Sequence, residues 1–468
     1  MRRRYLPLVM GLLYSTGLTA MAADKSGAED LITKGKYLAT AADCGACHTS
    51  PHQGAPMAGG YAIQSPLGTI FASNITPSKV AGIGDYSERD FARAVREGIN
   101  KQGQHLYPAM PYISYSRITD PDIHALYAYF MHGVKPVDEP SPPTHLPFPF
   151  NIRASMAVWN ALFAGNKPFT SSPKVADDVN RGDYLVNALE HCDTCHTPRN
   201  ALMGQDNGKA LSGGSLGSWY APNITPDRNS GIGEWSAADL TQYLKTGHLG
   251  GKAQAAGPMA EAVEHSLQFL SDDDIHAIVA YLHQIPAVDT GSAKPRDGYG
   301  QPSASELLMR GQTDNADAGW KVFSGSCANC HQADGQGNGY YPPLFHNSAT
   351  GADRPDNLVS AILYGVHRDV SGEQVAMPAF GPDAPFSERL SDQQIADVSN
   401  YVLKHYGNPQ VGVTADQVKI IREGGEKPLL AKLTSPASLL AAAIILLLVL
   451  IIVLVLLAKR RRKHDGKK

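Results

Sequence analysis

The hydrophobic pattern is uneven along the chain, because each end carries a continuous apolar run. Near the N-terminus, an apolar stretch from Leu6 to Ala20 follows three arginines, and Ala20-Met21-Ala22 then supplies small residues. A basic start, a short apolar segment and a small-residue cleavage site are typical of a secretory signal. Glycine, serine and threonine make the run weak for a membrane helix. The pattern therefore predicts an export signal at residues 1–22, with the folded body outside the cytoplasm.

The apolar run near the C-terminus is longer and contains no charge. It extends from Leu439 to Ala458. As a helix with a rise of about 1.5 Å per residue it would span about 30 Å, the thickness of the hydrocarbon core of a bilayer. Basic residues at 459–468 follow it, and such residues stay on the cytoplasmic side of a membrane. We expect a transmembrane helix at 436–458 that anchors a periplasmic body to a bacterial inner membrane.

Between the ends, amphipathic helical segments recur in three similar groups. Each group begins with a predicted helix that contains a glycine, and each ends with a predicted helix that starts at Ser or Thr. Glycine permits two helices to cross closely, while Ser or Thr as N-cap followed by Asp satisfies free amides. Aromatic residues recur in the last helices, where we expect them to pack against the first. The repeated positions are Gly35, Gly182 and Gly319; Thr119, Ser271 and Ser391; and Tyr127, Tyr129, Tyr281 and Tyr401.

Every cysteine of the chain belongs to one of three CxxCH motifs, CGACH, CDTCH and CANCH. In this motif two thiols bind the two vinyl groups of a haem, and the next residue directs an imidazole nitrogen at the iron. We therefore predict three covalently bound c-type haems. The predicted attachment residues are Cys44, Cys47, Cys192, Cys195, Cys327 and Cys330, and the predicted iron ligands are His48, His196 and His331. Each motif stands alone, which disfavours a zinc site, and a redox dithiol needs neither the histidine nor three copies.

The motifs divide the chain into three tandem domains that we expect to resemble class I cytochrome c, in a mostly α fold. The predicted segments are 1–22 signal, 23–135 domain 1, 136–152 proline-rich linker, 153–290 domain 2, 291–310 linker, 311–408 domain 3, 409–435 stalk, 436–458 anchor and 459–468 tail. Domains 1 and 2 share an Asn-Ile-Thr-Pro segment, at Asn74 and Asn223, that domain 3 lacks. This segment could line the haem edge or form a structural turn, and the sequence leaves both readings open.

The sixth ligand of each iron decides between electron transfer and catalysis, because an iron closed by methionine cannot readily bind oxygen or peroxide. Met377 is the only methionine after the motif of domain 3. Met110 and Met259 lie at matching separations from their histidines, and we expect all three in loops before the last helix. Met57 and Met203 follow their motifs too closely to reach the opposite side of a haem. We predict Met110, Met259 and Met377 as ligands, and no catalytic residue.

Composition narrows the function further. The chain has 41 Lys and Arg against 44 Asp and Glu. Much of the positive charge lies at the two ends, so the body is acidic and does not suit a nucleic-acid binder. The chain also lacks the glycine-rich dinucleotide fingerprint and any recognisable flavin site, so we expect substrate oxidation to take place on another subunit.

Three CxxCH motifs, the Asn-Ile-Thr-Pro repeat, the proline-rich linker running into Trp159 and a single C-terminal apolar run together resemble a known family. This family comprises the triheme cytochrome c subunits of bacterial membrane-bound dehydrogenases of the gluconate, alcohol, sorbitol and fructose types. The resemblance implies a catalytic partner of the FAD or PQQ type, a small accessory subunit, and electron transfer through three haems to ubiquinone. A freestanding carrier to a terminal oxidase, or a haem enzyme such as a peroxidase, remain the alternatives.

Overall fold

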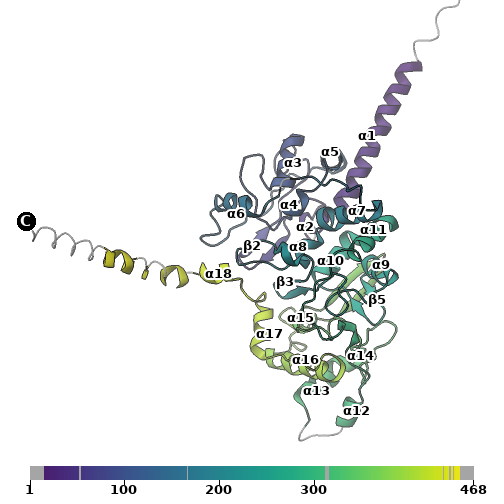
Figure 1. The fold of residues 1–468 in the computed structure, drawn as a ribbon, viewed down its shortest axis with the longest axis vertical. Coiled ribbons are helices and arrows are strands. Elements are labelled where there is room, and N and C mark those ends of the chain that lie inside the picture. Colours follow the sequence, from purple (N-terminus) through teal and green to yellow (C-terminus); the bar gives the residue numbers. More distant parts are fainter. Residues whose placement is uncertain are drawn as a thin grey trace, which may run out of the picture.

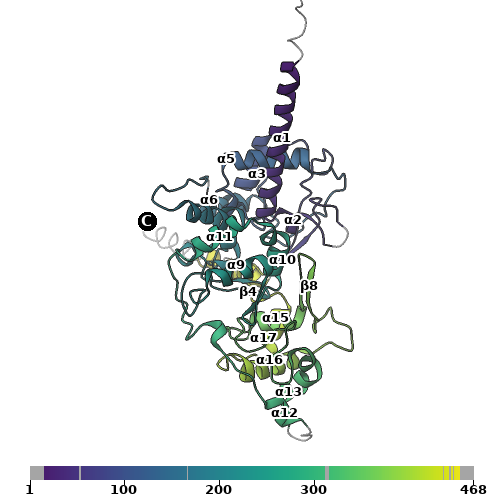
Figure 2. The same cartoon turned by 90° about the vertical axis from the view of Figure 1, so that its right-hand side faces the viewer.

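The computed structural model describes residues 15–51, 54–165, 167–310, 316–435, 437–441, 444–445 and 447–453. The domains follow one another along the long axis of the molecule (Figure 1). Helix α1 (Ser15–Ala41) projects from one end, and α12 (Ser305–Met309) and α13 (Ala318–Val322) lie at the other. Figure 2 shows the same order after a quarter turn. Among the described residues the strands form four two-stranded antiparallel sheets, and helices make up most of the regular secondary structure.

Domain 1 begins with the C-terminal part of α1 and ends with α5. Its cytochrome motif forms the short helix α2, directly after α1. The elements after α1 are α2 (Cys44–His48), β1 (Ala62–Ser65), β2 (Gly68–Phe71), α3 (Glu88–Glu97), α4 (Tyr112–Tyr115), α5 (Asp120–Ala128) and the π-helical turn η1 (Tyr129–Gly133). Residues 1–14 of the predicted export signal lie outside the described residues, and Ser15 to Ala22 form the start of α1.

Domain 2 repeats this plan with two further helices before its last one. Helix α6 (Ser155–Phe163) connects it to domain 1. The later elements are α7 (Asp177–Tyr184), η2 (Leu185–Leu189), α8 (Cys192–His196), η3 (Asn207–Lys209), β3 (Gly214–Leu216), β4 (Trp219–Ala221), α9 (Ala237–Thr246), β5 (His248–Leu249), β6 (Ala253–Gln254), α10 (Pro258–His265), η4 (Leu267–Phe269) and α11 (Asp272–Leu282).

Domain 3 has a longer hairpin at the place where domain 2 has β5 and β6. After η5 (Arg296–Gly298), α12 and α13, its elements are η6 (Phe323–Cys327), α14 (Ala328–His331), α15 (Asp356–Tyr364), β7 (Val366–Val370), β8 (Glu373–Met377) and α16 (Asp392–Tyr406). Helices α17 (Ala415–Arg422) and α18 (Leu429–Leu433) follow.

The expected close crossing of first and last helices is confirmed in all three domains. A Cβ on Gly35 would lie 2.0 Å from the backbone oxygen of Ala125 in α5. The same addition on Gly182 would lie 2.0 Å from the oxygen of Ala277 in α11. On Gly319 it would lie 2.2 Å from the backbone oxygen of a residue in α16. Only glycine allows backbones to approach this closely, so the repeated glycine fixes the frame of each domain.

Replacing Gly182 with Ala should destabilise the chain, because the new methyl group forces α7 away from α11. We expect the free energy of unfolding to fall by about 1–3 kcal/mol, as in other overpacked contacts. Gly325→Ala is the matched control, since a Cβ there has no atom within 4 Å. Urea unfolding followed by circular dichroism compares the two variants. If the two variants are equally stable, the contact between α7 and α11 accommodates a methyl group and the prediction is wrong.

The predicted capping residues occupy the N-cap of each last helix, but they do not all act alike. Ser271 accepts a hydrogen bond from the amide of Asp274, and Ser391 forms a capping box with Gln394. Thr119 has the extended backbone of an N-cap, yet its side chain accepts no amide. Pro121 follows it in the first turn and has no amide hydrogen to donate.

Domains 1 and 2 share a single hydrophobic core, which also includes Val370 of β7, whereas the rest of the buried core of domain 3 forms a second cluster. Buried residues of α1 and α5 join those of η2 and α11 in the first cluster. The second cluster includes Val418 and Ile421 of α17, which are buried against domain 3. The stalk expected at 409–435 therefore begins as part of domain 3, because α17 has an apolar face that packs on the domain.

The transmembrane helix expected at 436–458 is a prediction that proves wrong. No helix among the described residues is both long and apolar enough to cross a membrane. Pro436, Ala442, Ala443, Leu446 and residues 454–468, with the expected basic tail, lie outside the described residues.

Candidate haem sites

The cytochrome motifs of all three domains form about one turn of helix, but the backbone enters this turn in two different ways. In domains 1 and 2 the residue before the first cysteine, Asp43 or His191, has a left-handed backbone with φ of 50° and 40°. Asp and His tolerate this conformation better than most residues do. In domain 3 the π-helical turn η6 runs into Cys327, and the left-handed residue is Gln332, after the motif. The backbone around the motif in domain 3 therefore differs from that in domains 1 and 2, although the motif is the same.

The three motif histidines are oriented by backbone carbonyls. The Nδ1 atoms of His48, His196 and His331 lie 2.7, 2.6 and 3.0 Å from the oxygens of Ser73, Pro222 and Pro342. A carbonyl only accepts, so Nδ1 carries the proton and Nε2 is left with its lone pair for a metal. Burial also lowers the pKa of all three imidazoles, to about 4 for His196, which keeps them neutral.

The six cysteines are free of disulfides and half-buried in the same motifs as these histidines. Burial raises the pKa of Cys44, Cys47 and Cys327 to about 12, and that of Cys195 to about 11. These thiols therefore lack the thiolate character that zinc ligands and reactive redox cysteines have. Within the described part of the chain, no three His, Cys, Asp or Glu side chains group as a metal site.

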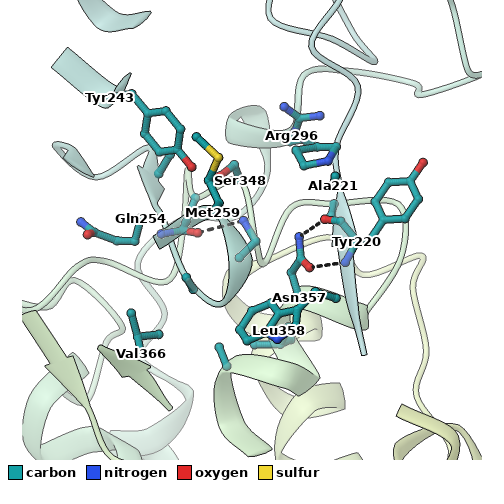
Figure 3. Close-up of a pocket in the computed structure, with 18 of the residues that line it drawn as sticks. Tyr220, Ala221, Tyr243, Gln254, Met259, Arg296, Ser348, Asn357, Leu358 and Val366 are labelled. Atoms are coloured by element: carbon teal, nitrogen blue, oxygen red, sulfur yellow. Dashed lines mark hydrogen bonds between the residues drawn. The ribbon is translucent and has the colours of Figure 1, made fainter. Parts of the chain in front are cut away.

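One cavity of about 530 Å³ connects the motifs of domains 2 and 3. His196 and Met259 line it from domain 2, and His331 and Met377 line it from domain 3. Apolar side chains form most of the wall, as a largely apolar macrocycle requires. Figure 3 shows Met259 and Tyr243 in this cavity. The residues present therefore fit a haem in each of these two domains, and the two sites open into each other.

Side chains of domain 3 hold the two halves of this cavity together. The amide of Asn357 in α15 pairs with both backbone groups of Tyr220 in β4, at 2.9 Å each (Figure 3). Arg368 of β7 donates to the backbone oxygen of Ala255 at 2.8 Å and to Gln254 at 2.9 Å. These bonds join domain 3 to the strands and the loop that precede Met259, and so fix the relation of the two haem sites.

The three predicted methionine ligands lie in different local structures. Met110 is in a loop, as expected, but the short helix α4 lies between it and the last helix α5. Met259 instead starts α10, after a left-handed Gly257, and Met377 ends strand β8. The expected loop position was therefore wrong for these two, because α10 begins one residue before Met259 and the hairpin strand β8 extends as far as Met377. Met57 lies beside motif 1, with its Cε 3.8 Å from the Cβ position of Gly45.

The Asn-Ile-Thr-Pro segments clamp the chain that leaves each domain. Asn74 donates to the backbone oxygens of Val137 and Glu139 at 2.8 and 3.0 Å, and Thr76 accepts from the amide of Val137. In domain 2, Asn223, Thr225 and Val288 repeat the arrangement. The residue before each Asn supplies the carbonyl that orients the motif histidine. The segment therefore acts as a structural turn and also supports the haem site.

Motifs 1 and 2 lie close together across the boundary of their domains. The hydroxyl of Tyr115 donates to the backbone oxygen of Ala42 at 2.5 Å, two residues before motif 1. The ring of Tyr115 meets that of His191, next to motif 2, with 5.5 Å between centroids. Ser114 also donates to Asp193, within motif 2, at 2.9 Å. The short helix α4 thus connects the first two sites, which no sequence motif had indicated.

A buried carboxyl group, Glu190, lies at this boundary just before motif 2. Its side chain is bonded by the hydroxyl of Ser266 at 2.7 Å. Burial raises the pKa of Glu190 to about 8, the charge of Asp274 adds to this rise, and the Ser266 hydrogen bond opposes it. Glu190 is therefore protonated in the folded chain at neutral pH.

The protonation of Glu190 predicts a pH dependence of stability. The folded state keeps this proton up to about pH 8, whereas the unfolded chain loses it near its ordinary value of 4.5. The unfolded state then binds fewer protons between these values, so the free energy of unfolding should fall as pH rises through this window. Glu190→Gln should remove this slope, while Glu234→Gln on the surface should not. The midpoint of urea unfolding, measured from pH 5 to 9, gives the slope for each variant. If the midpoint of Glu190→Gln falls with pH as steeply as that of Glu234→Gln, the prediction is wrong.

Comparisons with known proteins agree with this geometry. A family model for cytochrome c matches residues 179–286 and 316–405. The fructose dehydrogenase cytochrome subunit of Gluconobacter japonicus is 50% identical over 87% of this chain and 86% of its own. The gluconate 2-dehydrogenase cytochrome c subunit of Pantoea cypripedii is 41% identical over 90% and 96%. The cytochrome c subunit of the Gluconobacter oxydans quinone alcohol dehydrogenase is 39% identical over 88% and 87%.

Membership of the cytochrome c family indicates that the CxxCH motifs bind haem c covalently. The high identity extends over nearly the whole length of the dehydrogenase subunits as well. This chain belongs to the family of electron-transferring cytochrome c subunits of fructose, gluconate and alcohol dehydrogenases.

Proposed function

We propose that this chain carries three covalent haems and transfers electrons from a catalytic dehydrogenase subunit to ubiquinone. When bound, haem c supplies an iron that gains and loses single electrons. The observation that carries the proposal is the cavity shared by His196, Met259, His331 and Met377. Two sites that open into each other need no diffusing carrier between them. Tyr115 contacts Ala42, just before the motif of domain 1, and His191, just before the motif of domain 2. These contacts support the proposal that the haem sites of domains 1 and 2 also lie close together.

The proposed axial ligands are His48 with Met110, His196 with Met259, and His331 with Met377. A thioether on the sixth position closes the iron against small ligands and raises its potential, which suits electron transfer rather than peroxidase chemistry. The neutral, carbonyl-oriented histidines support this assignment on the proximal side. For domains 2 and 3 the shared cavity supports the distal side as well, because Met259 and Met377 line it.

The proposed partner is a catalytic subunit with FAD or PQQ that oxidises a sugar, a sugar acid or an alcohol, with a small accessory subunit. The names of the relatives, which are subunits of fructose, gluconate and alcohol dehydrogenases, support this class of partner. We place the haem domains on the periplasmic side of the inner membrane, because haem c is attached outside the cytoplasm and residues 1–22 are typical of an export signal.

Co-purification tests this proposal directly. A tagged full chain is isolated from detergent-solubilised membranes, and fructose, gluconate and ethanol are offered together with a short-chain ubiquinone. We expect a flavin- or PQQ-containing subunit to co-purify, and one substrate to drive ubiquinone reduction. A chain that purifies without a dehydrogenase and passes electrons to a terminal oxidase instead would support a freestanding carrier and contradict the proposal.

A further inference from the structure

Arg296 lies in the segment expected to be only a linker, yet its side chain lines the cavity (Figure 3). Cys192, Cys195 and His196 line the same cavity. Its Nη1 donates to the backbone oxygens of Asn223 and Ser230 at 3.3 and 3.1 Å. The neighbouring carbonyl of Pro222 accepts from the imidazole of His196. Consecutive carbonyls of one segment therefore bind the guanidinium and the proximal histidine, which fixes Arg296 next to the iron site of domain 2.

The charge of Arg296 has no ion-pair partner among the described residues. Its sequence neighbour Asp297 faces Lys252, with 3.8 Å between the charged atoms. Asp353 accepts hydrogen bonds from Ser292 and Asn408 instead. Burial lowers the pKa of Arg296 despite the opposing charges of Tyr243, Asp297, Tyr220 and Asp353. A guanidinium stays protonated in proteins, and a buried charge without a counter-ion is costly, so this position calls for an anion.

The other arginine on the cavity wall provides a contrast. Arg354 binds both carboxylate oxygens of Asp356 at 2.8 and 3.0 Å and stacks on the ring of Tyr220 at 4.0 Å. Its charge is therefore balanced within the chain. Arg296 is bound only by neutral oxygens, and its Nε and Nη2 make no hydrogen bond within the described part of the chain.

We propose that Arg296 binds a propionate carboxylate of the haem of domain 2 and thereby raises the potential of that haem. This inference rests on the proposed haem at Cys192 and Cys195. A haem brings two carboxylates into an otherwise apolar cavity, and the planar fork of a guanidinium matches a carboxylate. Neutralising the propionate removes a negative charge that would favour the oxidised iron. The segment 291–310 is then part of the site of domain 2 as well as its connection to domain 3.

A redox titration of the purified full chain, followed by absorbance, tests the proposal. Arg296→Gln should lower the midpoint potential of one haem by about 59 mV, which is a tenfold change in its one-electron equilibrium constant. That potential should also become dependent on pH near neutrality, because an unpaired buried propionate takes up a proton on reduction. A merely structural role would not produce this pH dependence. A Met259→His variant identifies which wave belongs to domain 2.

Two further variants sharpen the result. Arg228→Gln removes the same charge from the surface of domain 2, where Arg228 pairs with Glu234, and should shift the potential less than about twofold in the equilibrium constant. Arg296→Lys keeps the charge and should recover most of the potential. If Arg296→Gln does not accumulate haem, Arg296→Lys alone should still show a smaller shift of the same wave in the same direction.

The proposal is overturned by unchanged potentials in both Arg296 variants, by equal shifts in both, or by a shift confined to another haem. Mass spectrometry of the wild-type chain separates these failures from failure of the proposed function. If Cys192 and Cys195 carry no haem, the proposed function fails for this domain. If they carry haem and its potential ignores Arg296, only the present inference is wrong.

Discussion

A chain in which Cys192 and Cys195 are both replaced with Ala should lose about a third of its covalent haem and almost all substrate-driven ubiquinone reduction. Ubiquinone reduction should stop because the haem site of domain 2 lies between the other two. It shares its cavity with the site of domain 3, and Tyr115 connects it to the site of domain 1. The dehydrogenase should still turn over with an artificial acceptor. Steady-state ubiquinone reduction and the haem-to-protein ratio measure both effects.

The control for this variant is Met203→Leu, which changes domain 2 at a methionine that we do not assign to the iron. It should keep all haem and full ubiquinone reduction. The double-cysteine variant must also be shown to bind the dehydrogenase, because haem-binding domains depend on their cofactor to fold. A partner-bound variant that lacks the middle haem but reduces ubiquinone at the wild-type rate would refute the serial arrangement.

Replacing Met377 with Ala should leave the haem of domain 3 attached and lower its potential, because attachment uses Cys327 and Cys330 and the thioether acts on the iron. The methionine–iron charge-transfer band of the oxidised chain should lose about a third of its intensity if all three haems are His/Met. Ubiquinone reduction should slow, while the artificial-acceptor assay stays constant. Absorbance spectra and redox titration together provide the measurement.

Met309→Ala is the matched control for Met377, since Met309 packs partly buried against the same core of domain 3. It should affect stability but leave the band and the potentials unchanged. An unchanged band in Met377→Ala would mean that Met377 only fills space. Domain 3 would then hold an open or bis-histidine iron, and catalysis at that site would become the better hypothesis.

The features that sequence reasoning predicted are those that local residues determine. The repeated glycines could be predicted to cross closely because no other residue allows that contact, and Gly35, Gly182 and Gly319 all do so. The haem motif defines its own chemistry within five residues. Met259 was chosen by its spacing and Met377 as the only methionine after the motif of domain 3, and both assignments stay predictions. The helix that carries Met259 and the strand that carries Met377 were not foreseen.

The features that were missed arise from contacts between distant segments. Asn223 clamps Val288, and Arg296 reaches back to the carbonyls of Asn223 and Ser230, so neither role is visible in the composition of a linker. The apolar face of α17 was overlooked because it lies in a polar segment between domain 3 and a strongly apolar run. That run in turn led to a membrane helix that the described residues do not contain.

The intact mass of the purified chain tests the central claim most directly, because it counts the covalent haems that the electron path requires. We predict three haem additions, and digestion should locate them on the peptides that contain Cys44 and Cys47, Cys192 and Cys195, and Cys327 and Cys330. Two additions or fewer in a chain that is saturated with haem during its synthesis would contradict the account of three haems in series.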